Sequence, residues 1–368
     1  MDLMDAGGSG PVFFAPNRVW RCYTGGALLD RFRGVRPERD GHEPEEWLAS
    51  TVRAVNGVHS RGPDEGLACV ATASGGQQLF IDLLKGEGAR ILGAPHVARH
   101  GTDLGVLCKY LDSAVRLPIQ CHPDATIAQA LYHSRHGKTE CWFIVNTRRI
   151  GGEDPYLLVG FKPGVTAESF RQAAQAQDTA LMTAMLHRIQ CQPGEMYFIP
   201  GRMPHAIGPG VFMVETQEPS DWVVQPESRC ADTCLTPDDM WGPLTPEQAL
   251  AVFDYTPMDR EETLRRIRPT PRVVSRGPGC EAFALIGAEH TQAFAVMSMS
   301  VHGACPLTIP RSFGVIVVVQ GDGELRWPAG KRRVCAGDYF LLPFSLSQGD
   351  CEVTGSDLNL LICLPPVA

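Results

Sequence analysis

The same short pattern occurs twice in this chain, as GEMYFIP at residues 194–200 and as GDYFLLP at residues 337–343. In both copies a glycine and an acidic residue precede four apolar or aromatic residues, and a proline follows them. This order is typical of a turn that leads into a short buried strand. Two copies so far apart indicate an internal repeat, and they favour two similar β-structures within one chain.

The sequence around these copies consists largely of short apolar runs separated by the 38 glycines and 29 prolines. Strands are predicted at residues 19–23, 78–82, 117–122, 141–145, 156–161 and, with a tight Gly321-Asp322-Gly323 turn between two strands, 313–325. Many short strands with turn residues between them are typical of all-β sandwiches and barrels rather than of alternating strands and helices.

Helical spacing of apolar residues interrupts this pattern in three places. We predict helices at residues 124–136, with Gly137 as the stop, and at residues 166–187. The third segment, residues 236–268, contains Thr245-Pro246-Glu247, where the proline suits the first position of a helix. This segment is expected to connect the two β-rich parts.

Length, composition and charge exclude several classes of protein. The chain has 368 residues, 44% hydrophobic and 20% charged, enough for two or three domains at about 150 residues each. No apolar run approaches the roughly 18 residues of a membrane span, and the N-terminus lacks a signal peptide pattern, so we expect a cytoplasmic protein without a membrane partner. The net charge of −8 argues against nucleic acid as a partner. Thirteen scattered cysteines are expected to be free thiols.

Four residues could together bind a metal ion. Gln120 and His122 are two apart on a predicted strand, so their side chains share one face, and Lys138, Glu140 and Trp142 do the same. His205 follows a predicted strand end. Two imidazoles, a carboxylate and an amide oxygen without any thiolate suit an open, catalytic Zn²⁺ site better than a structural one. From the residues alone, satisfied polar side chains are the alternative interpretation.

Three segments resemble the signature sequences of the type I mannose-6-phosphate isomerases, a family of zinc-dependent cupin enzymes. They are PIQCHPD at 118–124, GKTECW at 137–142 and PHAIG at 204–208, and EEWLAST at 45–51 and VETQEPSD at 214–221 fit the same family. The resemblance implies two cupin-like (jelly-roll) β-barrels in a mainly β fold. It implies a catalytic domain over residues 1–235, a helical connector over 236–275 and a barrel without metal over 276–368. It also implies one Zn²⁺ per chain, bound by Gln120, His122, Glu140 and His205.

The resemblance assigns catalytic roles as well, with one departure. Lys138 matches a functional lysine of the family, and Glu215 is the first candidate for the carboxylate that moves a proton. Gln225 stands where the family carries an arginine, and an amide cannot make the charged bidentate contacts of a guanidinium. Among Arg21, Arg202 and Arg229, the best placed replacement in sequence is Arg202, three residues before His205.

We therefore expect a zinc-dependent aldose–ketose isomerase that interconverts mannose 6-phosphate and fructose 6-phosphate through an enediol. Two alternatives stay open because of Gln225. The chain could isomerise another or an unphosphorylated sugar, or it could be a catalytically silent cupin that binds a sugar. The sequence does not decide the oligomeric state.

Overall fold

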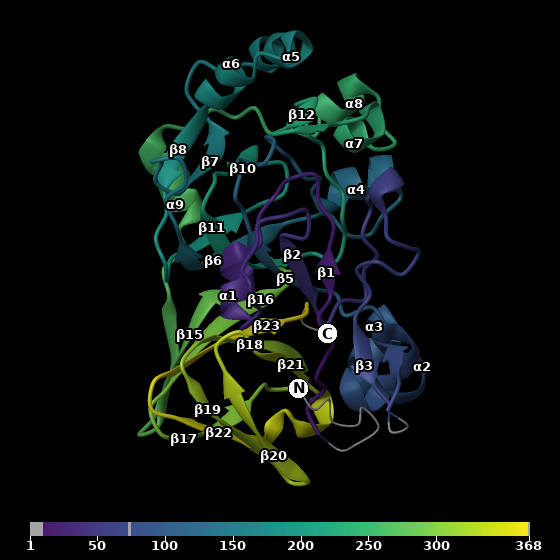
Figure 1. Ribbon diagram of the computed structural model, residues 1–368, viewed down its shortest axis with the longest axis vertical. Helices are drawn as coiled ribbons and strands as arrows, with labels where there is room; N and C mark the ends of the chain where they lie inside the picture. The colour runs from purple at the N-terminus through teal and green to yellow at the C-terminus, as the bar shows by residue number, and fades with distance from the viewer. Residues whose placement is uncertain (1–9, 73–74, 367–368) are drawn as a thin grey trace.

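Four β-sheets form the framework of the computed structural model, which describes residues 10–72 and 75–366 (Figure 1). In the first half, a six-stranded sheet has the order β1 (Arg18–Val19), β2 (Glu45–Leu48), β5 (Leu107–Asp112), β11 (Val211–Gln217), β6 (Glu140–Thr147), β9 (Met196–Ile199). A three-stranded sheet has the order β10 (His205–Ile207), β7 (Tyr156–Phe161), β8 (Leu186–Gln190). The neighbouring strands pair antiparallel.

The second half repeats this plan with a longer second sheet. Its six-stranded sheet has the order β14 (Arg272–Arg276), β15 (Cys280–Ile286), β16 (Ala295–Val301), β23 (Leu358–Leu364), β18 (Gly314–Gln320), β21 (Tyr339–Leu342). The four-stranded sheet has the order β17 (Ala304–Thr308), β22 (Gln348–Gly355), β19 (Asp322–Trp327), β20 (Gly330–Cys335). Two small two-stranded sheets complete the set, β3 (Cys69–Ala71) with β4 (Gln77–Leu79) and β12 (Arg229–Cys230) with β13 (Thr233–Cys234).

The internal repeat is confirmed by the places of β9 and β21. Each is formed by one copy of the repeated pattern, and each lies at the end of a six-stranded sheet, beside β6 and β18 respectively. The mainly β prediction is also confirmed. Among the described residues, the strand pairing divides each half into two separate sheets rather than one closed barrel.

The apolar core lies in layers between these sheets. One cluster joins the two six-stranded sheets, for example through Phe212 and Val214 of β11 with Val315 and Val317 of β18. A second cluster fills the space between the sheets of the second half. A third, which includes Trp142, lies between β6 and the strands β7 and β8, so the first half is a sandwich.

Helices cover the ends and edges of the sheets. They are α1 (Ala27–Phe32), α2 (Phe80–Ile91), α3 (Ala94–His100), α4 (Ala125–Tyr132), α5 (Ala167–Ala176), α6 (Thr179–Ala184), α7 (Pro237–Trp241), α8 (Pro246–Leu250) and α9 (Arg260–Ile267). The segment at 236–268 is helical as predicted, but it forms three short helices that each begin at a capping box. None of the described helices is long and apolar enough to cross a membrane.

Several predicted boundaries were wrong. The helix expected at 124–136 ends at Tyr132 because His133 takes the left-handed conformation (φ 53°), and the one expected at 166–187 breaks in the same way at Gln177 (φ 52°). Residues 80–82, expected in a strand, begin α2. The strand expected at 117–122 is an extended segment held by two isolated bridges, Gln120 to His205 and Cys121 to Val224.

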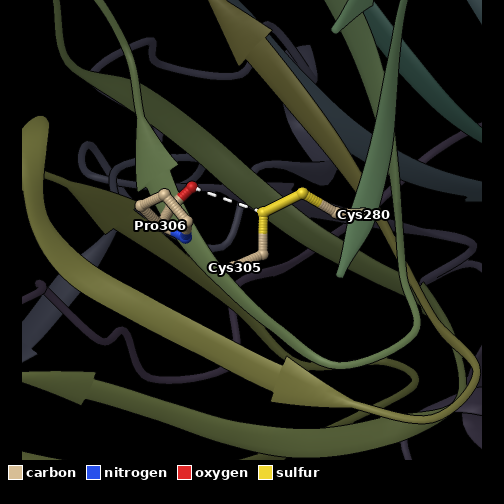
Figure 2. The surroundings of a disulfide bond; sticks show 3 residues. All are labelled: Cys280, Cys305 and Pro306. Carbon is tan, nitrogen blue, oxygen red and sulfur yellow. Dashed lines mark hydrogen bonds between the residues drawn. A yellow bond between two sulfur atoms is a disulfide. The ribbon is translucent and has the colours of Figure 1, made fainter. Parts of the chain in front are cut away.

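The expectation of thirteen free thiols was also wrong, because Cys280 and Cys305 form a disulfide (Figure 2). Cys280 begins β15 and Cys305 lies in β17, and the chain between them returns so that their Cα atoms are 6.1 Å apart. This separation lies within the range that a disulfide spans. Their 25-residue separation in sequence gives no sign of the pairing, since connectivity cannot be deduced from spacing alone.

Candidate metal centre and surrounding pocket

Three potential metal ligands meet where the two sheets of the first half approach each other. Glu140 is the first residue of β6, and His205 is the first residue of β10. His122 belongs to the extended segment before α4, which is tied to β10 by backbone hydrogen bonds between Gln120 and His205 in both directions (2.8 and 2.9 Å). The isolated bridge therefore fixes one imidazole beside the other.

The ligand atoms of these residues all lie within 4.8 Å of one another. His205 Nε2 is 3.3 Å from Glu140 Oε1, and His122 Nε2 is 3.5 Å from Glu140 Oε2. The other ring nitrogens are taken up by backbone carbonyls, since His122 Nδ1 lies 2.8 Å from the oxygen of Trp222 and His205 Nδ1 lies 2.9 Å from that of Met203. Such contacts fix the tautomer and orient Nε2 toward a shared ion.

The electrostatics of the two imidazoles also suit a metal. Burial lowers the pKa of His205 to about 4, and burial together with Lys138 lowers the pKa of His122 well below its usual range. Both rings are therefore neutral near pH 7, which is the form that binds metals. Burial raises the pKa of the third donor, the Glu140 carboxyl. A cation beside this carboxylate would offset the cost of its burial, and the donor set fits a divalent ion.

Lys138 supplies such a cation in the structure. Its Nζ lies 2.8 Å from His122 Nε2 and 2.5 Å from Glu140 Oε2. Burial opposes the charge, but Glu140 and Glu215 outweigh it and raise the pKa of Lys138. The ammonium thus contacts two of the three donors that a divalent ion would share.

Glu215 connects this group to a second set of buried charges. It lies on β11 next to β6, and its carboxylate is 3.7 Å from Lys138 Nζ and 3.5 Å from Lys109 Nζ. Burial opposes its ionisation, but Lys109 and Lys138 hold the pKa of Glu215 well below its usual range. Glu215 is therefore a carboxylate that stays ionised between two ammonium groups.

Of the remaining residues predicted from sequence, some line the same pocket and others lie outside it. Gln120 lines the same pocket, as does Gln225, whose Nε2 donates to the backbone oxygen of Asp239 at 2.8 Å. Arg202 is not among the described residues that line the pocket, and its Nε donates to the oxygen of Val252. Arg229 is exposed beside Cys234.

Arg21 is the arginine that the structure places at the pocket. Its guanidinium pairs with Asp221 (3.1 Å) and with Glu45 (3.1 Å), and it lies over the Trp47 ring. Glu45 also accepts from Tyr23 Oη at 2.6 Å and lies 3.7 Å from Lys109 Nζ. Burial opposes the ionisation of Glu45, but Arg21 and Lys109 outweigh it and lower its pKa to about 2.

Sequence reasoning gave no role to Glu45, Lys109 or Asp221. Glu45 and Asp221 do belong to the family-like segments at 45–51 and 214–221, and this was the available signal. Lys109 lies in β5 within a largely apolar run and carried no signal of its own.

The three potential metal ligands line one cavity of about 230 Å³ together with Lys138, Glu215, Lys109, Glu45 and Arg21. Beside His122, its lining includes Tyr132 from the end of α4 and Trp222, whose ring centroids are 4.8 Å apart. A buried group of metal ligands and charged residues in a cavity with aromatic lining is the arrangement expected of a small-molecule site.

Comparisons with known proteins agree on one family. No family model matches the chain. Among the similar curated proteins are two from Bacillus subtilis, the "Probable mannose-6-phosphate isomerase GmuF" (25% identical, covering 93% of this chain and 97% of that protein) and the mannose-6-phosphate isomerase ManA (23% identical, covering 93% and 96%). The crystal structure of the mannose 6-phosphate isomerase from Bacillus subtilis aligns with a TM-score of 0.72 at 22% identity, covering 96% of this chain and 99% of that one. This last likeness shows a shared fold over both halves.

Proposed function

Because this chain belongs to the mannose-6-phosphate isomerase family, we propose that it is a zinc-dependent aldose–ketose isomerase. The reaction would move a proton between C1 and C2 of a sugar through an enediol. The names of the relatives support mannose 6-phosphate and fructose 6-phosphate as the first pair to test, with free mannose and fructose as the second pair.

One observation carries this proposal. The Nε2 atoms of the two imidazoles and the Glu140 carboxylate lie in the lining of the same cavity as Lys138 and the ionised carboxylate of Glu215. Isomerisation needs a positive group at the sugar oxygens and a base at the neighbouring carbons, and both lie within this group.

Each residue has a proposed role. His122, Glu140 and His205, with Gln120 as the fourth ligand, would hold one zinc ion per chain. When bound, such an ion supplies a Lewis acid for the sugar oxygens. Lys138 would donate to an oxygen that gains negative charge in the enediolate. Glu215 would take the proton from one carbon at a carboxylate oxygen and return it to the other.

The wider organisation of the chain is part of the same proposal. We propose that residues 1–235 form the catalytic part, residues 236–275 connect it to the second part, and residues 276–368 bind no metal. Metal analysis of the purified protein should give about one zinc per chain, as expected for a single catalytic site.

The test is an isomerase assay on metal-replete protein with mannose 6-phosphate, fructose 6-phosphate, mannose and fructose as separate substrates. We expect turnover of at least one pair, and its loss after chelation and recovery after zinc is restored. Protein that holds zinc but converts none of the four sugars would contradict the isomerase proposal. It would support the alternative of a silent sugar-binding protein.

A further inference from the structure

The backbone that carries Lys138 lies outside the strand ladders of the sheet beside it. β6 begins at Glu140, which pairs with Gln217 of β11 on one side and with Ile199 of β9 on the other. Lys138 is two residues earlier, in a stretch that belongs to neither a strand nor a helix. The place of its buried ammonium therefore depends on contacts that a sheet does not supply.

Glu218 supplies two of these contacts through the two oxygens of its side chain. Its Oε2 accepts from the Gly137 N–H at 3.0 Å, and its Oε1 accepts from the Thr139 N–H at 3.1 Å. In addition, the Glu218 N–H donates to the Thr139 carbonyl oxygen at 3.0 Å. One carboxylate thus holds the residues on both sides of Lys138. Glu218 is 7% exposed, so little water competes for these bonds.

The same backbone is held from two further directions. The buried Ser220 donates from Oγ to the Gly137 carbonyl oxygen at 2.5 Å. From the side of the segment before α4, the Pro123 carbonyl oxygen accepts from the Lys138 N–H at 2.9 Å. A side chain at Gly137 would come within 2.7 Å of that same oxygen, so only glycine fits this close approach.

Glu218 and Ser220 have no direct place in the chemistry of the site. Neither is among the described residues that line the cavity. Both oxygens of the Glu218 carboxylate already accept from backbone N–H groups. Any effect of Glu218 on a reaction in the cavity must therefore pass through the residues that it holds.

We propose that Glu218 is a positioning residue, which fixes the backbone around Lys138 so that the ammonium meets the oxygen that gains charge during isomerisation. A lysine side chain is long and flexible, so its reach is defined only when its backbone is fixed. Glu140 is held by its own ladders and does not need Glu218 in the same way. This inference rests on the proposed isomerase function for the reaction that Lys138 serves, whereas the hold on residues 137–139 can be measured without it.

Glu218→Gln in the zinc-loaded protein tests the proposal. The amide keeps one acceptor oxygen but turns its NH₂ group toward the second backbone N–H, so one neighbour of Lys138 is released. We expect kcat to fall about 10–100-fold, because a small displacement of a catalytic group is costly. KM should stay within about threefold of the wild-type value, and zinc content should not change. An unchanged kcat would overturn the inference.

A double-mutant cycle with Lys138→Ala separates positioning from a general structural role. If Glu218 acts through Lys138, then Glu218→Gln should lower kcat less than about twofold further once Lys138 is alanine. A further fall as large as in the wild-type background would overturn the inference. Ser220→Ala removes one bond to Gly137 and should give a smaller fall with the same non-additivity. This second variant decides the question should Glu218→Gln not fold.

A matched control and a second measurement complete the test. Glu262 is an exposed carboxylate that also accepts a backbone N–H, from Asp259 at 3.0 Å in α9, and Glu262→Gln should leave kcat unchanged. Where the wild-type protein converts no sugar, the isomerase proposal fails, and hydrogen exchange of the peptide that contains residues 137–139 decides the inference. Faster exchange of this peptide in Glu218→Gln, with zinc retained, would support the inference, and unchanged exchange would overturn it.

Discussion

At the scale of single residues, the donor atoms of the metal group predict the order in which alanine variants lose zinc. His122→Ala and Glu140→Ala each remove a strong donor from a buried group, so we expect zinc content to fall to near zero. Gln120→Ala removes a neutral amide oxygen, a weaker donor, and should lower zinc affinity less. Metal analysis of dialysed variants, with circular dichroism to confirm folding, measures the order. Full zinc occupancy in Glu140→Ala would contradict the assignment.

Lys138 should behave differently from these ligands although it contacts two of them. Lys138→Ala removes a positive charge 2.8 Å from His122 Nε2, so zinc affinity should stay the same or rise. Turnover should fall by about 10²–10³, because a donor to the developing oxyanion is lost. Lys85→Ala removes a 70% exposed side chain on α2 and serves as the control. Loss of zinc from Lys138→Ala would make Lys138 a structural part of the metal group instead.

The residues of the metal group could be predicted from sequence, but the charged residues that surround them in the pocket could not. His122, Glu140 and His205 lie in segments whose spacing and resemblance marked them, and the structure brings all three together. The pairing of Arg21 with Asp221 joins residues that are 200 positions apart, and no local pattern encodes such a contact. Arg202, the arginine preferred from its sequence position, lies outside the lining because its side chain turns to the Val252 carbonyl.

At the scale of elements, the segment that carries Gln120 and His122 depends on a buried carboxylate. Glu227 is 2% exposed, and its Oε1 accepts from the Ile119 N–H at 2.6 Å. Both its oxygens also bind Arg116, at 2.8 and 2.5 Å. Because this segment lacks a continuous strand ladder, Glu227 replaces part of the hydrogen bonding that a sheet would provide.

We therefore expect Glu227→Gln to weaken both the segment and the metal site. An amide in place of the carboxylate loses the charged pair with Arg116, which should lower the free energy of unfolding by about 1–3 kcal/mol. Zinc affinity should fall about tenfold, since the ligands are held less well. Urea titration and metal competition measure the two effects, with Glu153→Gln, an exposed ion-pair partner of Arg188, as the control. Unchanged zinc affinity would show that the isolated bridges alone hold His122.

Whether a segment forms a strand or a helix was more predictable from sequence than the residue at which it ends. The β7 strand at 156–161 and the repeat strands β9 and β21 follow from apolar runs bounded by turn residues. The breaks at His133 and Gln177 do not, because left-handed helix ends usually carry glycine or asparagine. Gln177 Nε2 donates at that position to the backbone oxygens of Ala174 and Pro226 (2.8 Å each), a contact that its neighbours in sequence do not predict. Phe80 begins a helix although its neighbours have the pattern of a strand, and it is fully buried against Phe14, so its tertiary contacts rather than its local pattern accompany the helix.

At the scale of the whole molecule, the disulfide and the metal group lie in different halves. Replacing both Cys280 and Cys305 by Ser opens a loop of 25 residues, and the chain-entropy relation gives a loss of about 3.5 kcal/mol. We expect this loss in urea unfolding of the second half, and we expect wild-type protein in reductant to show the same change. Zinc affinity should not change. A weaker zinc site in the double variant would mean that the two halves are coupled.

The backbone bridge between Val12 and Leu341 has a consequence for synthesis on the ribosome. Val12 pairs with β21 by hydrogen bonds in both directions (2.9 Å each), although the two residues are roughly 330 positions apart. At about 5–20 residues per second, the first of these residues would wait some 15–65 seconds for its partner to be made. Phe13 and Phe14, which pack on Phe340 and Tyr339, would be without these partners throughout. These two aromatic side chains therefore lack their partners on β21 until the last strands of the chain have been made.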